Sequence, residues 1–194
     1  MDTFVSAARP SSGKARISIL AVVLALLVAV AGGLAAPRAQ ALPQLGSVVC
    51  GGTTSATYDP GITYTPQNVS YEATRDYQGC VVIGGGGITS LQDEHIVSSG
   101  TRSCLDLLST QSITKTYVWD TGATSTFEGT YTYVQAASVL TIVWDGTFTA
   151  GAFDGHHVRQ VLEYPGVDAL TACSSPQGLQ ELDNGIVAFT VLPL

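Results

Sequence analysis

ITKTYVW, residues 113–119, is the stretch that decides the fold class. Successive side chains of a β-strand point to opposite faces, so Ile113, Tyr117 and Trp119 would share one face. Lys115 falls on that same face, and the threonines fall on the other. One side of the segment is therefore larger and more apolar, with a single charge in its middle. This period of two predicts a strand with one buried side.

The rest of the chain from Ile62 onward repeats this pattern, with stretches rich in Thr, Val, Tyr and Ile between Gly, Asp, Pro and Ser. Strands are expected near 62–73, 78–83, 113–120, 125–134, 138–145, 156–164 and 185–192. Both faces of 139–144 are apolar, which predicts a central or doubly covered strand. The sequence therefore predicts an all-β fold, either an antiparallel β-sandwich or a small β-barrel.

Three short segments predict how the strands are connected. Residues 103–106, SCLD, are typical of the start of a short helix, with a buried loop as the alternative. The glycine run 84–87 predicts a mobile loop, and it lacks the Lys-Ser/Thr that follows in a phosphate-binding loop. The segments 118–122, VWDTG, and 143–146, VWDG, both place Trp-Asp before a glycine, which predicts a hairpin turn at each.

Residues 1–41 resemble a cleavable secretory signal peptide. Three basic side chains lie within the first 16 residues, and an almost uninterrupted apolar run, 17–36, follows them. Ala39 and Ala41 supply the small residues that a signal peptidase requires, so cleavage is expected between Ala41 and Leu42. The alternative is a retained N-terminal anchor, because the apolar run is nearly long enough to span a bilayer. Residues 42–194 are then a single secreted domain.

The charge of that domain excludes several partners. Residues 42–194 hold four basic and fourteen acidic side chains, and hence a net charge of −10. Phosphate backbones and anionic membranes would repel such a chain. We therefore expect no binding of nucleic acid, and no membrane association after signal cleavage.

All four cysteines lie in the predicted domain, in even number, which favours two disulfides in an oxidising compartment. We favour pairing Cys50 with Cys80 and Cys104 with Cys173, because the first pair closes an early hairpin. The other two pairings stay open. A zinc site is the alternative, but the sequence contains no CxxC pair. We predict no metal site and no cofactor.

Asp120-Thr121-Gly122 matches the loop motif of an aspartic protease, whose chemistry needs two aspartates that share a proton. A chain of this length could supply the second aspartate only by dimerising or from an internal copy. The similar segment at Asp145 lacks the threonine. A hairpin turn accounts for the same residues, and we predict no catalytic residue here.

Two polar clusters could begin a cation site. Asp154 and His156 would share one face of a strand, whereas His156 and His157 would point to opposite faces. A turn aspartate beside surface histidines explains the first cluster equally. The second cluster, residues 93–95 (DEH), is expected to be a solvated loop.

Trp119 and Trp144 could form an exposed aromatic platform that stacks on sugar rings. Four tyrosines could extend this platform, namely Tyr117, Tyr131, Tyr133 and Tyr164. The alternative, which we favour, is that these aromatic side chains fill the core of the domain.

The chain resembles the short exported β proteins of unknown function of high-GC Gram-positive bacteria. The matching residues are Cys50, Cys80, Ser103-Cys104, Trp119-Asp120-Thr121-Gly122 and Thr171-Ala172-Cys173. This resemblance implies secretion, a β fold and disulfides, and it implies no activity.

These observations predict a secreted, non-enzymatic domain that binds an extracellular protein or a glycan. Two alternatives remain: a secreted hydrolase or protease whose polar residues converge only in the fold, and a protease inhibitor that presents a disulfide-supported loop.

Overall fold

Residues 46–194 are described by a computed structural model, without the side chain of Leu108. Within this range the chain forms eight strands and two short helices. They are β1 (Ser47–Ile62), β2 (Gln67–Ile83), β3 (Glu94–Arg102), η1 (Cys104–Leu108, a 3-10 helix), β4 (Gln111–Val118), β5 (Thr124–Ala136), β6 (Val139–Gly151), β7 (His157–Pro165), α2 (Ala169–Ser174) and β8 (Leu179–Leu192). The predicted signal peptide, 1–41, lies outside the described residues.

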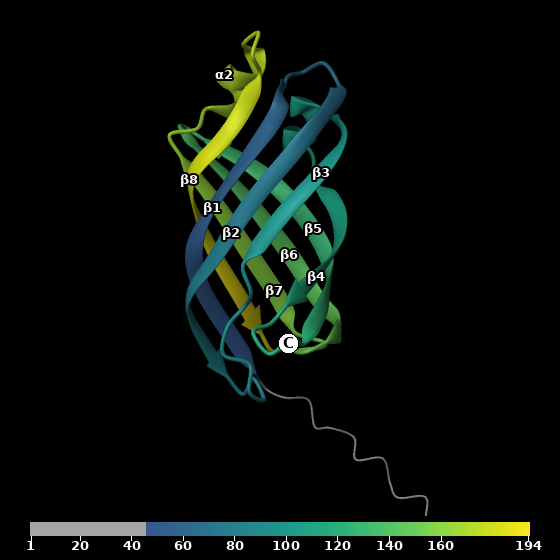
Figure 1. Ribbon diagram of the computed structural model, residues 1–194, viewed down its shortest axis with the longest axis vertical. Helices are drawn as coiled ribbons and strands as arrows, with labels where there is room; N and C mark the ends of the chain where they lie inside the picture. Colours follow the sequence, from purple (N-terminus) through teal and green to yellow (C-terminus); the bar gives the residue numbers. More distant parts are fainter. Residues whose placement is uncertain (1–45) are drawn as a thin grey trace, which may run out of the picture. The chain divides into compact units, whose positions relative to one another are not determined.

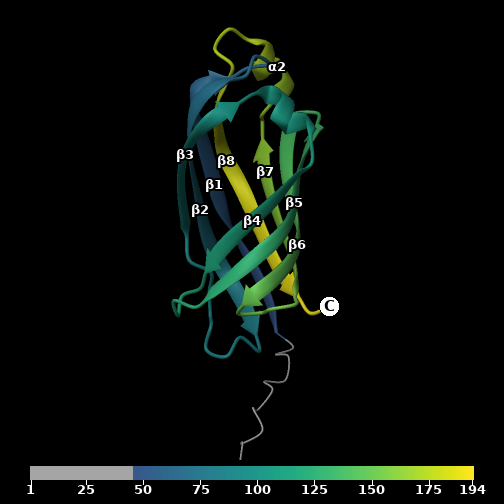
Figure 2. The same ribbon diagram turned by 90° about the vertical axis from the view of Figure 1, so that its right-hand side faces the viewer.

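All eight strands belong to one antiparallel sheet in the order β3-β2-β1-β8-β7-β6-β5-β4. The sheet curls into a half-barrel, and β3 and β4, its two edges, come to lie near each other (Figures 1 and 2). The all-β, antiparallel prediction is confirmed. Of the two architectures considered, the curled single sheet corresponds to the barrel and not to the two stacked sheets of a sandwich.

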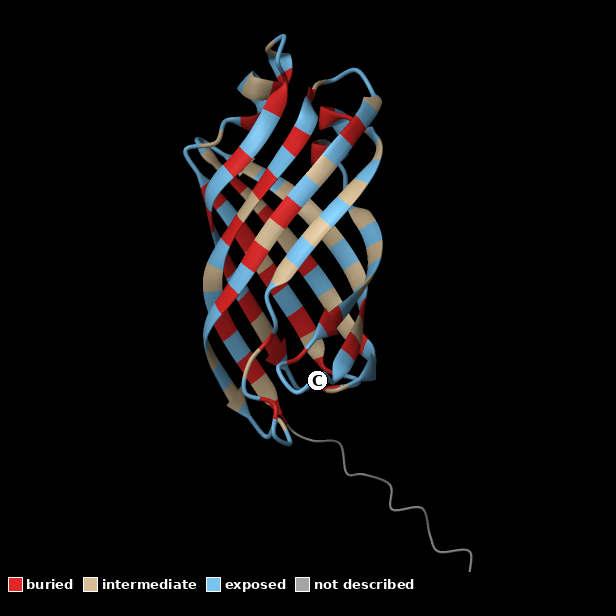
Figure 3. Cartoon of the chain, in the orientation of Figure 1, coloured by how far each residue is buried: buried red, intermediate tan, exposed pale blue. Residues whose placement is uncertain are grey.

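The alternation predicted for residues 113–119 is present. Tyr117 and Trp119 are buried, Ile113 is half-buried, and the Lys115 side chain points inward beside them. Figure 3 shows the same alternation of buried and exposed residues along most strands. The concave side of the sheet therefore holds the core, and the convex side faces solvent.

Several predicted strand boundaries are wrong. The segment 62–73 includes the end of β1, a turn and the first part of β2, and the predictions missed most of β1 and all of β3.

The predicted hairpin turn at 143–146 is also wrong, because β6 continues through it. Gly146 pairs with Gly129 of β5. A Cβ atom would lie 2.8 Å from the Phe127 ring if added at Gly146, and 2.6 Å from it if added at Gly129. These glycines make room for the ring and do not form a turn.

The other connections agree with the sequence. The chain turns between β4 and β5 at Gly122, where φ is 81°, in the left-handed region that glycine tolerates. The short helix predicted at 103–106 is η1, and the Asp106 carboxylate accepts the backbone N–H of Ser103 at 2.8 Å. The glycine run 84–87 lies in the connection from β2 to β3, as a loop should, and its mobility stays a prediction.

Both predicted disulfides are confirmed. Cys50–Cys80 joins β1 to β2, and Cys104–Cys173 joins η1 to α2. We call the end of the sheet that carries η1 and α2 the helical end. Such disulfides are typical of proteins from oxidising compartments. Among the described residues, no helix is long and apolar enough to cross a membrane.

Candidate functional site

The interior of the curled sheet has two differently filled halves. The half farther from η1 and α2, which we call the packed half, is filled by large aromatic rings. The Trp119 ring contacts Phe148, Phe153 and Phe189, and Phe127 joins this group through Tyr117. The half toward the helical end, which we call the cavity half, has more tyrosines than any other residue type in its lining: Tyr58, Tyr71, Tyr131, Tyr133 and Tyr164.

A layer of charged side chains separates the two halves. Glu94, the first residue of β3, accepts a hydrogen bond from Arg75 of β2 at 2.6 Å. The Lys115 ammonium of β4 contacts both carboxylate oxygens of Glu94, at 2.5 and 2.6 Å. The side chains of Arg75, Glu94 and Lys115 are only 4%, 14% and 14% exposed. Glu94 therefore joins the two edges of the sheet through a buried ion-pair network.

Uncharged groups continue this layer across the interior. The Tyr77 hydroxyl donates to Glu94 at 3.2 Å and accepts from the side-chain amide of Gln160 at 2.8 Å. Gln160, on β7, in turn accepts from the Tyr117 hydroxyl at 2.6 Å. A continuous set of hydrogen bonds thus runs from β3 to β7, and it satisfies polar groups whose burial would otherwise be costly.

The electrostatics of the layer follow from its burial. Burial alone would raise the pKa of the Glu94 carboxyl, but the charges of Lys115 and Arg75 outweigh it and hold that pKa below its ordinary value. Burial, and then the charge of Arg75, lower the pKa of the Lys115 ammonium to about 7 against the opposing effect of Glu94. Burial raises the pKa of the Tyr77 and Tyr117 hydroxyls. Both tyrosines therefore remain hydrogen-bond donors at neutral pH.

Trp144 of β6 lies between the charged layer and the cavity half. The Arg75 guanidinium and the Lys115 ammonium lie 5.1 and 4.9 Å from the centre of its ring. The Tyr131 ring stacks on it, with 5.7 Å between ring centres. The Phe127 ring, in the packed half, also lies 6.4 Å from Trp144, centre to centre. Trp144 therefore contacts both halves, and it is one of the residues that line the larger cavity.

Two neighbouring cavities occupy the cavity half. The larger, of about 200 Å³, has lining residues from all eight strands and therefore lies inside the curled sheet. The smaller, of about 150 Å³, lies toward η1 and has a more polar lining. Four residues border both cavities, namely Tyr58, Arg102, Tyr131 and Tyr133.

The larger cavity reaches the seam between β3 and β4. A bridge between Leu91 and Trp119 and the Glu94–Lys115 contact join the two edges near the packed half. Beyond that point the described residues of β3 and β4 share no ladder. Ile96 of β3 and Ile113 of β4, on these two free edges, both line the larger cavity.

Unpartnered hydrogen-bond donors gather around this cavity. Within residues 46–194, four buried side-chain nitrogens have no partner: Arg75 Nε, Arg102 Nε, Trp144 Nε1 and His156 Nε2. The first three belong to residues that line the larger cavity. Buried donors are paired in almost all native proteins, so three unpaired nitrogens on the lining residues of one cavity are unusual, although each of these nitrogens is itself shielded from the open space.

The residues of the predicted aromatic platform lie inside the fold. Trp119 is fully buried and Trp144 is 8% exposed, so neither offers a face to a sugar at the surface. Tyr117 is buried in the core, as the favoured alternative has it, whereas Tyr131, Tyr133 and Tyr164 line the larger cavity together with Trp144.

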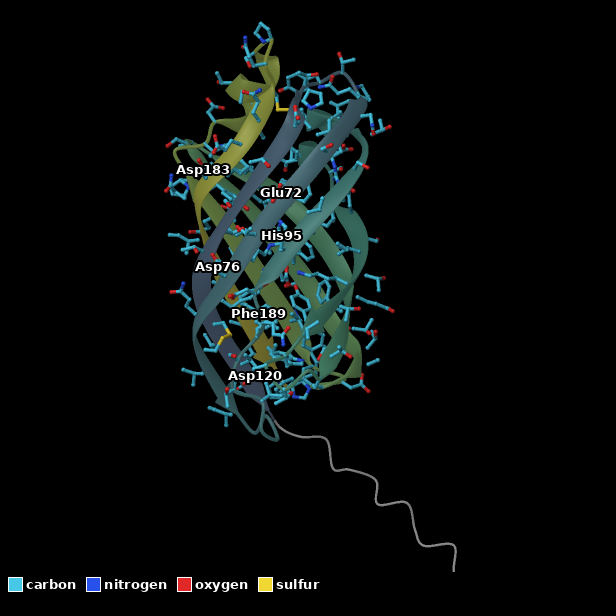
Figure 4. All side chains as sticks on the ribbon, viewed as in Figure 1. Glu72, Asp76, His95, Asp120, Asp183 and Phe189 are labelled. Carbon is cyan, nitrogen blue, oxygen red and sulfur yellow. A yellow bond between two sulfur atoms is a disulfide. The ribbon has the colours of Figure 1, made fainter. Side chains whose placement is uncertain are left out.

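Asp120 lies exposed in the turn after β4. Its carboxylate accepts hydrogen bonds from the backbone N–H and the hydroxyl of Thr89, and these lower its pKa. The side chain, labelled in Figure 4, thereby links the β4–β5 turn to Thr89 in the β2–β3 connection. This is a structural role, in keeping with the hairpin-turn interpretation.

The residues of the two predicted cation clusters do not converge on a common site in the fold. His156 is buried and Asp154 is exposed, and the His156 ring lies 3.2 Å from the backbone oxygen of Asp154 and not beside its carboxylate. The expectation that 93–95 is a solvated loop is wrong for Glu94, which faces the interior, while His95 points outward and pairs with Glu72 at 2.8 Å (Figure 4). No group of three metal-binding side chains occurs in the described part of the chain.

No protein-family model, curated protein or solved structure matches this chain. The sequence itself did not single out Arg75 or Arg102, and it predicted that Glu94 lies in a solvated loop. One signal did point to a buried acidic partner such as Glu94: Lys115 lies in the middle of an apolar face, where a charge requires a buried partner.

Proposed function

We propose that this protein is a secreted, non-enzymatic binding domain that takes a small, flat and partly apolar ligand into the cavity half of its curled sheet. The observation that carries the proposal is the pair of adjoining cavities lined by five tyrosines and Trp144. Ligand sites are typically concave and mostly apolar or aromatic, with a few polar groups that fix orientation.

The cavity volumes indicate the size of the ligand. An engineered protein cavity of about 150 Å³ binds benzene. The two cavities here, of about 200 and 150 Å³, adjoin at four shared residues. A ligand of about one or two fused rings is therefore the size that they would hold. A polysaccharide chain would not fit, although a terminal sugar ring could enter.

Burial of the aromatic residues supports an internal site over a surface site. The two tryptophans that could stack on a glycan at the surface are both inside the sheet. The stacked pair of Trp144 and Tyr131 instead borders the larger cavity. Such a pair suits a planar ligand, because aromatic rings favour stacked or edge-to-face contacts.

A thermal-shift titration tests the proposal. The chain is expressed with residues 1–41 in place, purified from the medium and titrated with 2-naphthol and with a soluble chitin hexasaccharide. At 100 times its Kd, naphthol would stabilise the fold by about 2.7 kcal/mol and raise the Tm by roughly 5 to 10 °C. The hexasaccharide should have no such effect.

An Ile142→Phe variant is the matched control. Ile142 lines the larger cavity, and a phenyl ring in its place would fill part of the space. This variant should lose the naphthol-induced shift. Naphthol that stabilises the variant as much as the wild type, or that stabilises neither, would contradict an internal site.

A further inference from the structure

The distribution of positive charge in this acidic domain is unusual. Residues 42–194 contain only four basic side chains. Three of them, Arg75, Arg102 and Lys115, point into the interior, and the fourth, Arg159, is exposed near Asp145 at 3.8 Å. Cations are costly to bury, so these three side chains require compensation by negative charge or by acceptors, and two of them, Arg75 and Arg102, line the larger cavity.

Glu94 compensates two of these three cations. Its carboxylate contacts both Arg75 and Lys115, as described above. Arg102 has no such partner, because no carboxylate of the described residues lies within 4.0 Å of it. Its Nη2 donates to the Ser98 hydroxyl at 2.9 Å, its guanidinium lies 5.0 Å from the Tyr71 ring centre, and its Nε has no acceptor.

Arg102 also occupies a central position, since it is one of the four residues that border both cavities. The other three are tyrosines. Burial raises the pKa of Tyr58, Tyr131 and Tyr133, so these hydroxyls remain protonated at neutral pH and can donate. Arg75 and Trp144, which line the larger cavity, also carry a nitrogen without a partner, but Arg75 Nε and Trp144 Nε1 are both shielded from the open space.

We infer that the ligand of these cavities carries a carboxylate, and that Arg102 binds it at the junction between them. This inference rests on the proposed function. The planar guanidinium matches a carboxylate in a two-point hydrogen bond, and such charge-assisted bonds are about twice as strong as neutral ones. The apolar part of the ligand then lies against Trp144 and the isoleucines of the larger cavity.

Asp106 limits the charge that the ligand can carry. It borders the smaller cavity, but it is exposed and its carboxylate accepts the Ser103 backbone N–H at the start of η1. A second anionic group placed in the smaller cavity would meet this carboxylate. A monoanion therefore fits the site better than a dianion.

The test compares two ligands of the same shape, 2-naphthoate and 2-naphthamide, by isothermal titration of the full secreted protein. We expect the wild type to bind the carboxylate about 10- to 100-fold more tightly than the amide. Arg102→Gln should remove this preference and leave the affinity for the amide within about twofold. Arg159→Gln, which removes an exposed cation, should leave both affinities unchanged.

If Arg102→Gln does not fold, the role of Arg102 is tested with Arg102→Lys and with an NMR titration of the wild type. The lysine retains the charge and loses the two-point geometry, so the preference should be reduced but not lost. In the wild type, the NMR signal of Arg102 Nε–H, assigned by its loss in Arg102→Lys, should shift with naphthoate and much less with naphthamide.

The outcomes separate the two proposals. Equal binding of both compounds to the wild type would overturn the carboxylate inference and leave the internal ligand site intact. A preference that persists in Arg102→Gln would overturn the role of Arg102. No binding of either compound to the folded wild type would count against the proposed function itself, and the inference would fail with it.

Discussion

The packed half and the cavity half of the interior are made by the same strands, yet they are filled in different ways. In the packed half the Phe189 ring lies within 6.4 Å, centre to centre, of Tyr77, Tyr117 and Trp119, and phenylalanine rings fill the space around them. In the cavity half tyrosines stand in place of phenylalanines and about 200 Å³ stays open. The comparison indicates that one half stabilises the fold and the other serves binding.

The largest expected effect comes from truncating an aromatic ring in each half. Phe189→Ala removes a fully buried ring and should lower the free energy of unfolding by about 3 to 5 kcal/mol. Tyr131→Ala removes a half-buried ring that already borders a cavity, and should cost about 1 to 2 kcal/mol because fewer contacts are lost. Urea unfolding with intact disulfides measures both. Equal losses would remove the distinction between the halves.

The layer between the halves gives the next largest effect. Glu94→Gln leaves Arg75 and Lys115 buried without their anionic partner, and should destabilise the protein by about 3 kcal/mol or more. Glu72→Gln is the control, because it breaks an exposed pair with His95 and should cost less than about 1 kcal/mol. A Glu94 variant as stable as the control would show that the layer does not hold the sheet edges together.

Acid should weaken the same layer. The pKa of Glu94 is lowered in the fold, so its contribution to stability is fully present above its unfolded value, near 4.5, and is lost as the pH falls through the lowered value. The free energy of unfolding of the wild type should therefore decrease more steeply below pH 4.5 than that of Glu94→Gln. Urea unfolding at a series of pH values tests this, and parallel curves would argue against a lowered pKa.

The smallest effect is expected from adding volume. Ile142→Phe places a larger side chain beside the open space of the cavity half and should change stability by less than about 1 kcal/mol. Val158→Phe adds volume at a fully buried position outside both cavities and should cost about 1 to 3 kcal/mol. If both variants lose stability alike, the cavity does not have the room ascribed to it.

Local patterns of the sequence predicted the strands with strong alternation and both disulfides, but not the strands that depend on their neighbours. β1 contains Gly51, Gly52 and several serines and threonines, and it is held by ladders to β2 and β8 on its two sides. β3 is short and polar, with Ser98, Ser99 and Gly100 in a row. The pairing that forms these strands involves residues distant in the sequence, which periodicity cannot detect.

The candidate site was still harder to predict, for a related reason. Arg75, Arg102 and Trp144 lie on three different strands, and only the register of the curled sheet brings them to one cavity. The sequence indicated that the aromatic residues form either a core or a surface platform. It could not indicate a cavity between them, because a cavity depends on how completely the opposing side chains fill the interior. The buried Lys115 was the one charge whose position on an apolar face was visible in the sequence.

The two tryptophans allow a direct test of the central claim, because Trp119 lies in the packed half and Trp144 borders the larger cavity. The measurement is a ¹H–¹⁵N NMR titration of the two indole N–H signals with 2-naphthol, with Trp119→Phe used for assignment. Trp119 Nε1 donates to Ser125 at 2.8 Å, whereas Trp144 Nε1 has no partner among the described residues. The account predicts that the Trp144 signal shifts strongly and the Trp119 signal stays in place. Equal shifts of both signals, or no shift of Trp144 at saturating naphthol, would contradict it.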